Sequence, residues 1–127
     1  MDIQKGFFIA GAILGFLTVA FGAFGAHALK HKLSPDMLTV FEVGVRYQMY
    51  HALALISTAL AYSLFPGVFL AWAGGFFVVG TLVFSGSLYA LALTGIRSIG
   101  AITPIGGVLL LFGWLALIGG TVWNSRN

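Results

Sequence analysis

Residues 34–67 read SPDMLTVFEVGVRYQMYHALALISTALAYSLFPG, and this stretch decides the fold. Its opening Ser-Pro-Asp supplies a helix N-cap, a proline suited to the first helical position and an acidic group for the positive helix end. Because no helix-breaking residue follows until Pro66, the stretch predicts one helix over residues 35–64. At 1.5 Å per residue such a helix is about 45 Å long, which exceeds the ~30 Å hydrocarbon core of a bilayer.

The composition around this helix is that of a membrane protein. The chain has 127 residues, of which 60% are hydrophobic and 7% are charged, whereas a soluble domain carries about 25% charged residues. A length of 127 residues predicts a single domain, here one integral membrane domain over residues 1–127. The formal charge of +3 belongs to loops at the lipid surface, and nothing indicates nucleic acid. The sequence has no cysteine, which excludes disulfides and thiolate metal sites.

Charged residues and helix breakers divide the apolar sequence into four segments. Basic residues follow the first segment at 30–32, Pro66-Gly67 forms a turn, and Arg97 precedes the last segment. The sequence therefore predicts an all-α membrane protein, a bundle of four transmembrane helices with glycine-rich packing seams. The expected spans are residues 6–29, 40–64, 68–93 and 102–123, with 35–46 as the interfacial start of the second helix.

Glycines recur on one face of the first and last predicted helices. Such stripes let helices approach closely in lipid, and we favour packing inside one bundle as their role. The same seams could also join copies of the chain, or attach it to a larger membrane complex. The glycines concerned are Gly11, Gly15, Gly22, Gly106, Gly113 and Gly120.

A polar stripe on the second helix is the candidate functional feature. Polar groups in a membrane helix face protein or a water-filled cavity, since unpaired polar groups are costly in hydrocarbon. The stripe predicts either a polar pocket or hydrogen bonds that fix the packing, and we favour packing for the hydroxyl groups. The candidate pocket residues are His27, Tyr47, Gln48, His51, Ser85, Ser87, Tyr89 and Thr103.

His51 is the residue of this stripe whose role is most open. An ionisable side chain inside a span suggests function, yet a neutral imidazole can also bridge two helices. A metal site with His27 and His31 is disfavoured by the flanking lysines, and a serine–histidine dyad lacks an orienting aspartate. We therefore assign no catalytic residue, metal or cofactor. Glu42 and Arg46, four residues apart, are expected to form an interfacial ion pair.

Membrane orientation depends on a small difference in the positions of Lys and Arg. Lys5 and Arg126 lie on the side of the termini, and Lys30, Lys32, Arg97 and the boundary residue Arg46 lie on the other. The positive-inside rule therefore leans toward termini outside the cell.

Four short motifs resemble one known family in order and spacing. They are Gly22-Ala-Phe-Gly-Ala-His27, Tyr47-Gln-Met-Tyr-His51, Phe84-Ser-Gly-Ser-Leu-Tyr89 and Thr103-Pro-Ile-Gly-Gly107. The chain is similar to the small bacterial membrane proteins of the domain of unknown function 423, the YgdD/YwdK-like or UPF0382 family. The resemblance covers nearly the whole chain and implies four helices in the bacterial cell (inner) membrane. It implies no established activity, cofactor or substrate. Because family members often carry basic residues in the second turn and the C-terminal tail, it favours the opposite orientation.

Two functional hypotheses follow, and they belong to different classes. The first is an interaction, assembly or structural component of the membrane, because the sequence has glycine-rich seams and no complete catalytic set. The second is a transporter or channel for a small solute or proton, with a polar pocket around His51. We prefer the first, because the polar groups are few enough to satisfy one another.

Overall fold

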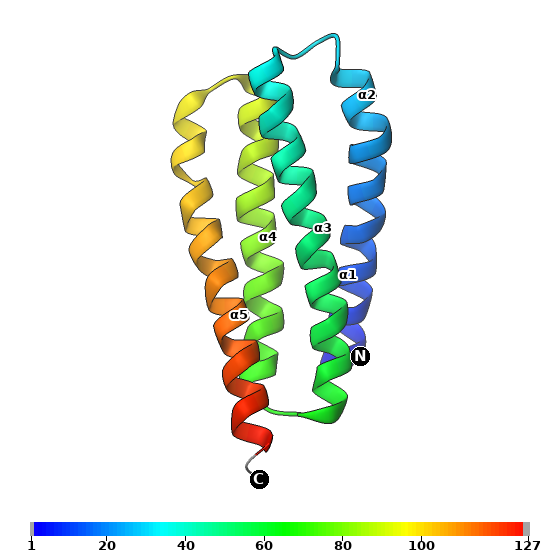
Figure 1. Cartoon of the computed structure of the whole chain (residues 1–127), viewed down its shortest axis with the longest axis vertical. Helices are drawn as coiled ribbons and strands as arrows, with labels where there is room; N and C mark the ends of the chain where they lie inside the picture. The colour runs from blue at the N-terminus through cyan, green and yellow to red at the C-terminus, as the bar shows by residue number, and fades with distance from the viewer. Residues whose placement is uncertain (1, 126–127) are drawn as a thin grey trace.

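The computed structural model describes residues 2–125, and this part of the chain consists of helices joined by short turns. Figure 1 shows four long helical rods, which is the all-α four-helix architecture predicted from the sequence. The first rod contains α1, a π-helical segment and α2 in succession; the second is α3, the third is α4, and a 3₁₀ turn leads into α5. Their bounds are α1 Ile3–Val19, π-helix Ala20–Gly25, α2 Ala26–Leu29, α3 Pro35–Leu64, α4 Val68–Thr94, 3₁₀ helix Arg97–Ala101 and α5 Thr103–Ser125.

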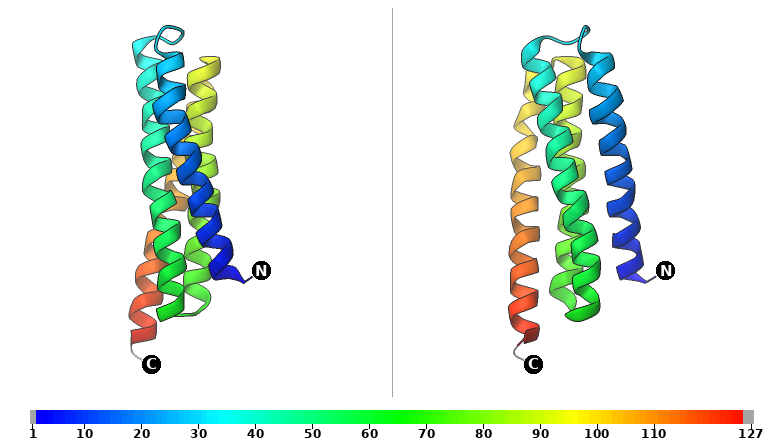
Figure 2. Two further views of the ribbon diagram at one scale, coloured as in Figure 1. Left: turned by 90° about the vertical axis from the view of Figure 1, so that its right-hand side faces the viewer. Right: turned by 45° about the vertical axis from the view of Figure 1, so that its right-hand side comes forward.

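Successive rods run in opposite directions, so the two termini lie at the same end of the bundle (Figure 1). The helices α3 and α4 pack on each other at the centre, while α1 packs mainly on α3 and α5 mainly on α4. The rotated views place α1 and α5 on opposite flanks of this central pair (Figure 2). As a result, the outer faces of α1 and α5 remain uncovered by the chain.

The helix ends follow the predicted local chemistry. The Ser34 side chain accepts a hydrogen bond from the Met37 amide at 3.2 Å, and Pro35 begins α3. At the end of α4, Gly95 has a φ of 71°, a left-handed conformation that favours glycine. The N-cap prediction at Ser34 is confirmed, and both caps depend only on a residue type and its immediate neighbours.

Three helical segments are long and apolar enough to cross a bilayer by length and composition: Ile3–Leu29, Val68–Thr94 and Arg97–Asn124. The central helix α3 does not reach the same hydropathy over the described residues. The polar side chains that lower its hydropathy include Gln48, His51 and Thr58, and all three are buried between helices. Arg126, which entered the charge comparison, lies outside the described residues.

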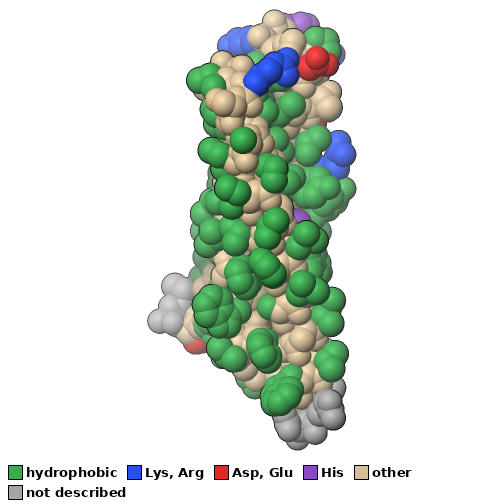
Figure 3. All heavy atoms as spheres, turned by 90° about the vertical axis from the view of Figure 1, so that its left-hand side faces the viewer, with side chains coloured by type: hydrophobic (Ala, Val, Ile, Leu, Met, Phe, Trp, Pro, Cys, Tyr) green, Lys and Arg blue, Asp and Glu red, His purple; other side chains and the backbone are tan. Residues whose placement is uncertain are grey.

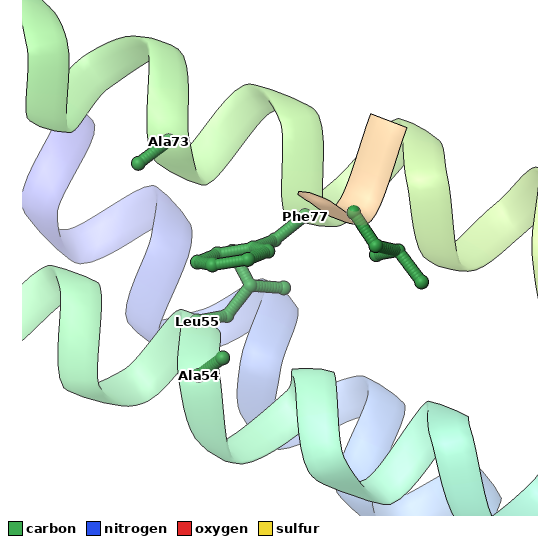
Figure 4. Packing of buried hydrophobic residues seen from close by; sticks show 5 residues of the cluster. Ala54, Leu55, Ala73 and Phe77 are labelled. Atoms are coloured by element: carbon green, nitrogen blue, oxygen red, sulfur yellow. The ribbon is translucent and has the colours of Figure 1, made fainter. Parts of the chain in front are cut away.

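Apolar side chains fill the centre of the bundle and also cover its surface. Figure 4 shows Phe77 of α4 lying over Leu55 and Ala54 of α3, close to Ala73. Leu110 of α5 completes this buried cluster. The space-filling view shows hydrophobic side chains along most of the visible face, with Lys and Arg gathered toward one end (Figure 3). A surface of this kind is suited to a lipid environment.

Five of the six glycines in the predicted seams pack against a neighbouring helix of the same chain. A Cβ at Gly11 would lie 2.7 Å from the Ala52 carbonyl oxygen, and one at Gly113 would lie 2.6 Å from the Phe77 ring. Gly15 is the exception, because a Cβ there would meet nothing within 4 Å. These five glycines therefore serve packing within the chain. The other glycines packed in this way are Gly22 against Val45, Gly106 against Phe84 and Gly120 against Phe69.

Candidate functional site

Gln48 lies at the centre of a polar network that joins three helices. Its side chain is 3% exposed and donates from Nε2 to the Leu14 carbonyl of α1 at 2.9 Å. Its Oε1 accepts from the Tyr89 hydroxyl of α4 at 2.5 Å. The Leu14 carbonyl also accepts from Thr18 Oγ1 at 2.7 Å. One glutamine of α3 is thus hydrogen-bonded to both α1 and α4.

His51 links α3 to α5, with both ring nitrogens engaged. Nδ1 lies 2.8 Å from the Tyr47 carbonyl oxygen, and Nε2 lies 3.1 Å from Nε1 of Trp114. Because an indole N–H only donates and a carbonyl only accepts, these partners require a neutral imidazole with its hydrogen on Nδ1. Phe77 packs beside the ring, with its centroid 5.6 Å away. His51 can exchange a proton with a solute only by breaking one of these bonds.

The two serines of the Phe84–Tyr89 motif make separate contacts. Ser85 donates to the Gly44 carbonyl of α3 at 2.7 Å. Ser87 donates to the Phe84 carbonyl of its own helix at 2.9 Å, so the Thr103 hydroxyl, 2.6 Å away, donates to Ser87. These bonds fasten α4 to α3 and to the start of α5.

Close packing holds Tyr89 in place for its hydrogen bond. A Cβ at Gly44 would lie 2.8 Å from Tyr89 Cε1, so only glycine leaves room for the ring at this position. The rings of Phe21 and Phe41 pack on Tyr89, with centroids 5.5 and 5.2 Å away. The phenol is therefore enclosed by aromatic rings while its hydroxyl reaches Gln48.

Not every candidate residue belongs to this network. His27 is exposed on α2, and its side chain makes no hydrogen bond or ion pair with the described residues. The Tyr47 ring, 38% exposed, packs on Phe84 at 4.7 Å between centroids and stacks on His51 at 6.4 Å. The hydrogen bond to His51 comes from the Tyr47 backbone carbonyl, and the Tyr47 hydroxyl takes no part in it. In the described part of the chain, no three His, Cys, Asp or Glu residues are placed to share a metal ion.

Glu42 and Arg46 are exposed and form no ion pair with each other in the described part of the chain. Their side chains instead line a recess between α3 and the end of the first rod. The expected ion pair is thus not formed in this structure. Its absence is consistent with the small free energy that such an exposed pair contributes.

Thr81 presents a buried hydroxyl without a partner. The residue is 2% exposed, and its Oγ1 has no hydrogen-bond acceptor or donor among the described residues. It lies beside Gln48, Ser85 and Tyr89 around a recess of 200 Å³ between α1, α3 and α4. Thr81 is the polar residue of this region that the network leaves unsatisfied.

Sequence reasoning did not identify three partners of the network. Trp114 lies in the middle of the last predicted span. Because an indole N–H at that depth needs an acceptor, the sequence did indicate that Trp114 must have a hydrogen-bond partner. The carbonyls of Leu14 and Gly44 carry no signal in the side-chain sequence. They become visible only once the helices are placed side by side.

Comparison with known proteins gives the same family as the motifs. The family described as "Protein of unknown function (DUF423)" matches residues 21–107, a range that includes all four motifs. The chain belongs to this family. It is 50% identical over 118 residues to a UPF0382 membrane protein of Staphylococcus saprophyticus, covering 93% of this chain and 98% of that protein.

More distant members of the DUF423 family also match over most of their length. The UPF0382 membrane protein YwdK of Bacillus subtilis is 43% identical, covering 91% of this chain and 94% of that protein. The UPF0382 inner membrane protein YgdD of Escherichia coli is 40% identical, covering 94% and 91%. No solved structure matches the chain. Together with the apolar helices, these relatives place the chain in the bacterial cell membrane as a multi-pass protein.

Proposed function

We propose that this protein is an interaction or assembly component of the cell membrane, built as a rigid bundle and not as a conduit. The observation that carries the proposal is the pairing of His51. Both of its nitrogens are occupied, by Tyr47 of its own helix and by Trp114 of α5, and the residue is 5% exposed. A transport site needs polar groups that are free to exchange partners with a solute, and the central polar residue here has none free.

The polar network has a structural role in this proposal. Gln48 joins α3 to both α1 and α4, and Ser85 adds a second bond between α3 and α4. Interhelical hydrogen bonds of this kind stabilise membrane bundles by about 0.6 kcal/mol each on average. Their main consequence is a single fixed arrangement of the helices, which presents the same outer faces at all times.

The outer face of α5 is the surface that we propose for contact with a second copy or a larger complex. Leu111, Leu115 and Ile118 are each about 60% exposed along one stripe of the helix. Gly119 lies on the same stripe, and a Cβ there would meet nothing within 4 Å. A small residue among exposed large ones gives another helix room to approach.

Cysteine cross-linking tests this assembly surface, because the natural chain has no cysteine to interfere. We expect Gly119→Cys to form disulfide-linked dimers in native membranes under mild oxidation. Leu60→Cys is the matched control, since Leu60 is also exposed but belongs to α3 and not to the proposed surface. Equal cross-linking at both positions, or none at position 119, would contradict self-association through α5.

Flux through reconstituted vesicles tests the alternative of a transporter. We expect proton and small-solute leakage to be the same in vesicles with the protein, with its His51→Ala variant and without protein. A flux that needs the protein and disappears in His51→Ala would overturn the proposal of a closed bundle.

A further inference from the structure

The geometry points to a binding site for one membrane lipid in the groove between the first rod and α3, selective for a phospholipid that carries a primary amine. Glu42 and Arg46 would hold its headgroup, and the apolar groove below them would hold an acyl chain. This inference does not depend on the assembly role proposed above.

The headgroup end is a recess of 350 Å³ that carries both signs of charge. Glu42, Val45 and Arg46 of α3 form one wall, and Gly22 and Ala26 form the other. Gly22 belongs to the π-helical segment Ala20–Gly25, and such interruptions of an α-helix are frequent at functional sites. The recess therefore combines two unpaired charges with a local departure from regular helix.

An apolar groove lies next to this recess, between the same two rods. Its volume is 570 Å³, and its α3 wall includes Met49, Leu53 and Ile56. Counted from Arg46, these residues follow at intervals of three or four positions, so they lie on the same face of α3 as Arg46. On the opposite wall Gly15 widens the groove, because it has no side chain and no neighbour at its Cβ position.

The dimensions of the groove match one lipid leaflet. From Arg46 to Ile56 the helix rises by about 15 Å at 1.5 Å per residue, which is half of a ~30 Å hydrocarbon core. A lipid whose phosphate lies at Arg46 would therefore have its acyl chain end near Ile56. A soluble ligand would not require a groove as long as one leaflet of the hydrocarbon core.

The charges select the headgroup. Arg46 can bind a phosphate through charge-assisted hydrogen bonds, and Glu42 can accept hydrogen bonds from a primary ammonium. The two side chains lie one helical turn apart, a spacing that a phosphate and an amine joined by two carbons can bridge. A glycerol headgroup carries no positive charge to pair with Glu42, and a quaternary choline ammonium has no N–H to donate. Ethanolamine is the headgroup that satisfies both residues.

The lack of protein partners for these two charges adds a second argument. Charged side chains at the edge of a span are stabilised by polar partners, from the protein or from lipid headgroups. Glu42 and Arg46 have no partner within the described chain. A zwitterionic headgroup would supply one for each.

Native mass spectrometry of the purified full chain tests the headgroup. With dioleoyl phosphatidylethanolamine, phosphatidylcholine and phosphatidylglycerol at equal concentration, we expect one lipid per chain, with the ethanolamine lipid favoured about tenfold. Arg46→Gln should lower its retention about tenfold, and Glu42→Gln should abolish the preference over choline. Arg97→Gln, at an exposed cation outside the groove, is the control and should change nothing. Equal retention of the three lipids by the parent chain would overturn the proposal.

Blocking the groove tests the acyl chain. Gly15→Leu should fill the groove and remove lipid retention, whereas Gly75→Leu, at another glycine with open space, should not. Leu53→Trp and Leu60→Trp form a second pair, since the two leucines are 56% and 55% exposed on the same helix and only Leu53 lines the groove. Retention that survives both groove variants would overturn the site. Displacement of the lipid by equimolar glycerophosphoethanolamine would also overturn it, because the headgroup alone would then suffice.

Discussion

The seam between α4 and α5 and the seam between α1 and α3 are both rich in glycine, yet only the first is closed along its length. On α5, Gly106 and Gly113 each face a bulky residue of α4, Phe84 and Phe77, with no space for a Cβ. On α1, Gly11 is equally tight, but one turn later Gly15 faces open space. The difference shows that a glycine closes a helix contact only where the backbone or a side chain of the neighbouring helix comes close to its Cβ position.

The largest effect is expected where a glycine meets the backbone of the neighbouring helix. A Cβ at Gly106 would lie 2.7 Å from Phe84 Cα, so we expect Gly106→Ala to lower the free energy of unfolding by about 2–3 kcal/mol. The adjacent Gly107→Ala is the control, since its Cβ would lie 3.8 Å from the Phe84 ring, an ordinary contact. Unfolding in SDS mixed micelles measures both, and equal losses would mean that the α4–α5 seam is not closed.

The next effect concerns the polar network between the two seams. Gln48→Leu leaves the Tyr89 hydroxyl without its acceptor, and we expect a loss of about 1–2 kcal/mol in the free energy of unfolding. A double-mutant cycle with Tyr89→Phe should give a coupling energy of about 0.6–1.7 kcal/mol. Strictly additive losses would show that the two residues do not bond to each other.

At Gly15, where the α1–α3 seam is open, a smaller effect is expected, and it should stabilise the protein. Gly15→Ala adds a methyl group in free space and a better helix former, so we expect the free energy of unfolding to stay constant or rise by up to ~1 kcal/mol. Gly11→Ala, whose Cβ would lie 2.7 Å from the Ala52 carbonyl oxygen, should instead destabilise the protein. Thermal unfolding in detergent distinguishes them, and a similar loss at both positions would mean that the groove is closed.

The smallest effect is expected at Thr81. Because its Oγ1 has no partner among the described residues, Thr81→Val removes no hydrogen bond and should change the free energy of unfolding by less than ~0.5 kcal/mol. Ser85→Ala, which removes the bond to the Gly44 carbonyl, should cost about 0.6 kcal/mol. A larger loss for Thr81→Val than for Ser85→Ala would show that Thr81 has a partner in the membrane.

Local signals predicted the helices well. Ser34, Pro66 and Gly95 fix helix ends through caps, a missing N–H or a left-handed conformation, and these effects act within a few residues. The open space at Gly15 could not be predicted from local signals. Whether a glycine closes a seam depends on the residue opposite it, and that residue is set by how two distant segments lie against each other.

The site was predictable in its residues but not in its bonds. Gln48, His51, Ser85 and Tyr89 were recognisable as polar side chains that must face protein. Their partners were not, because Leu14 and Gly44 contribute only backbone carbonyls and Trp114 lies 63 residues from His51. The sequence therefore shows which groups need partners, whereas the packing of the helices decides which partners they find.

The central claim is that the interior is closed, with His51 bonded at both nitrogens. Nitrogen-15 NMR of histidine-labelled protein in lipid bilayers tests this most directly, with the His51 signal assigned by its loss in His51→Asn. We predict a neutral imidazole that carries its hydrogen on Nδ1 and whose Nε2 signal shifts in Trp114→Phe. A His51 with its hydrogen on Nε2, or in rapid exchange with water, would contradict the account.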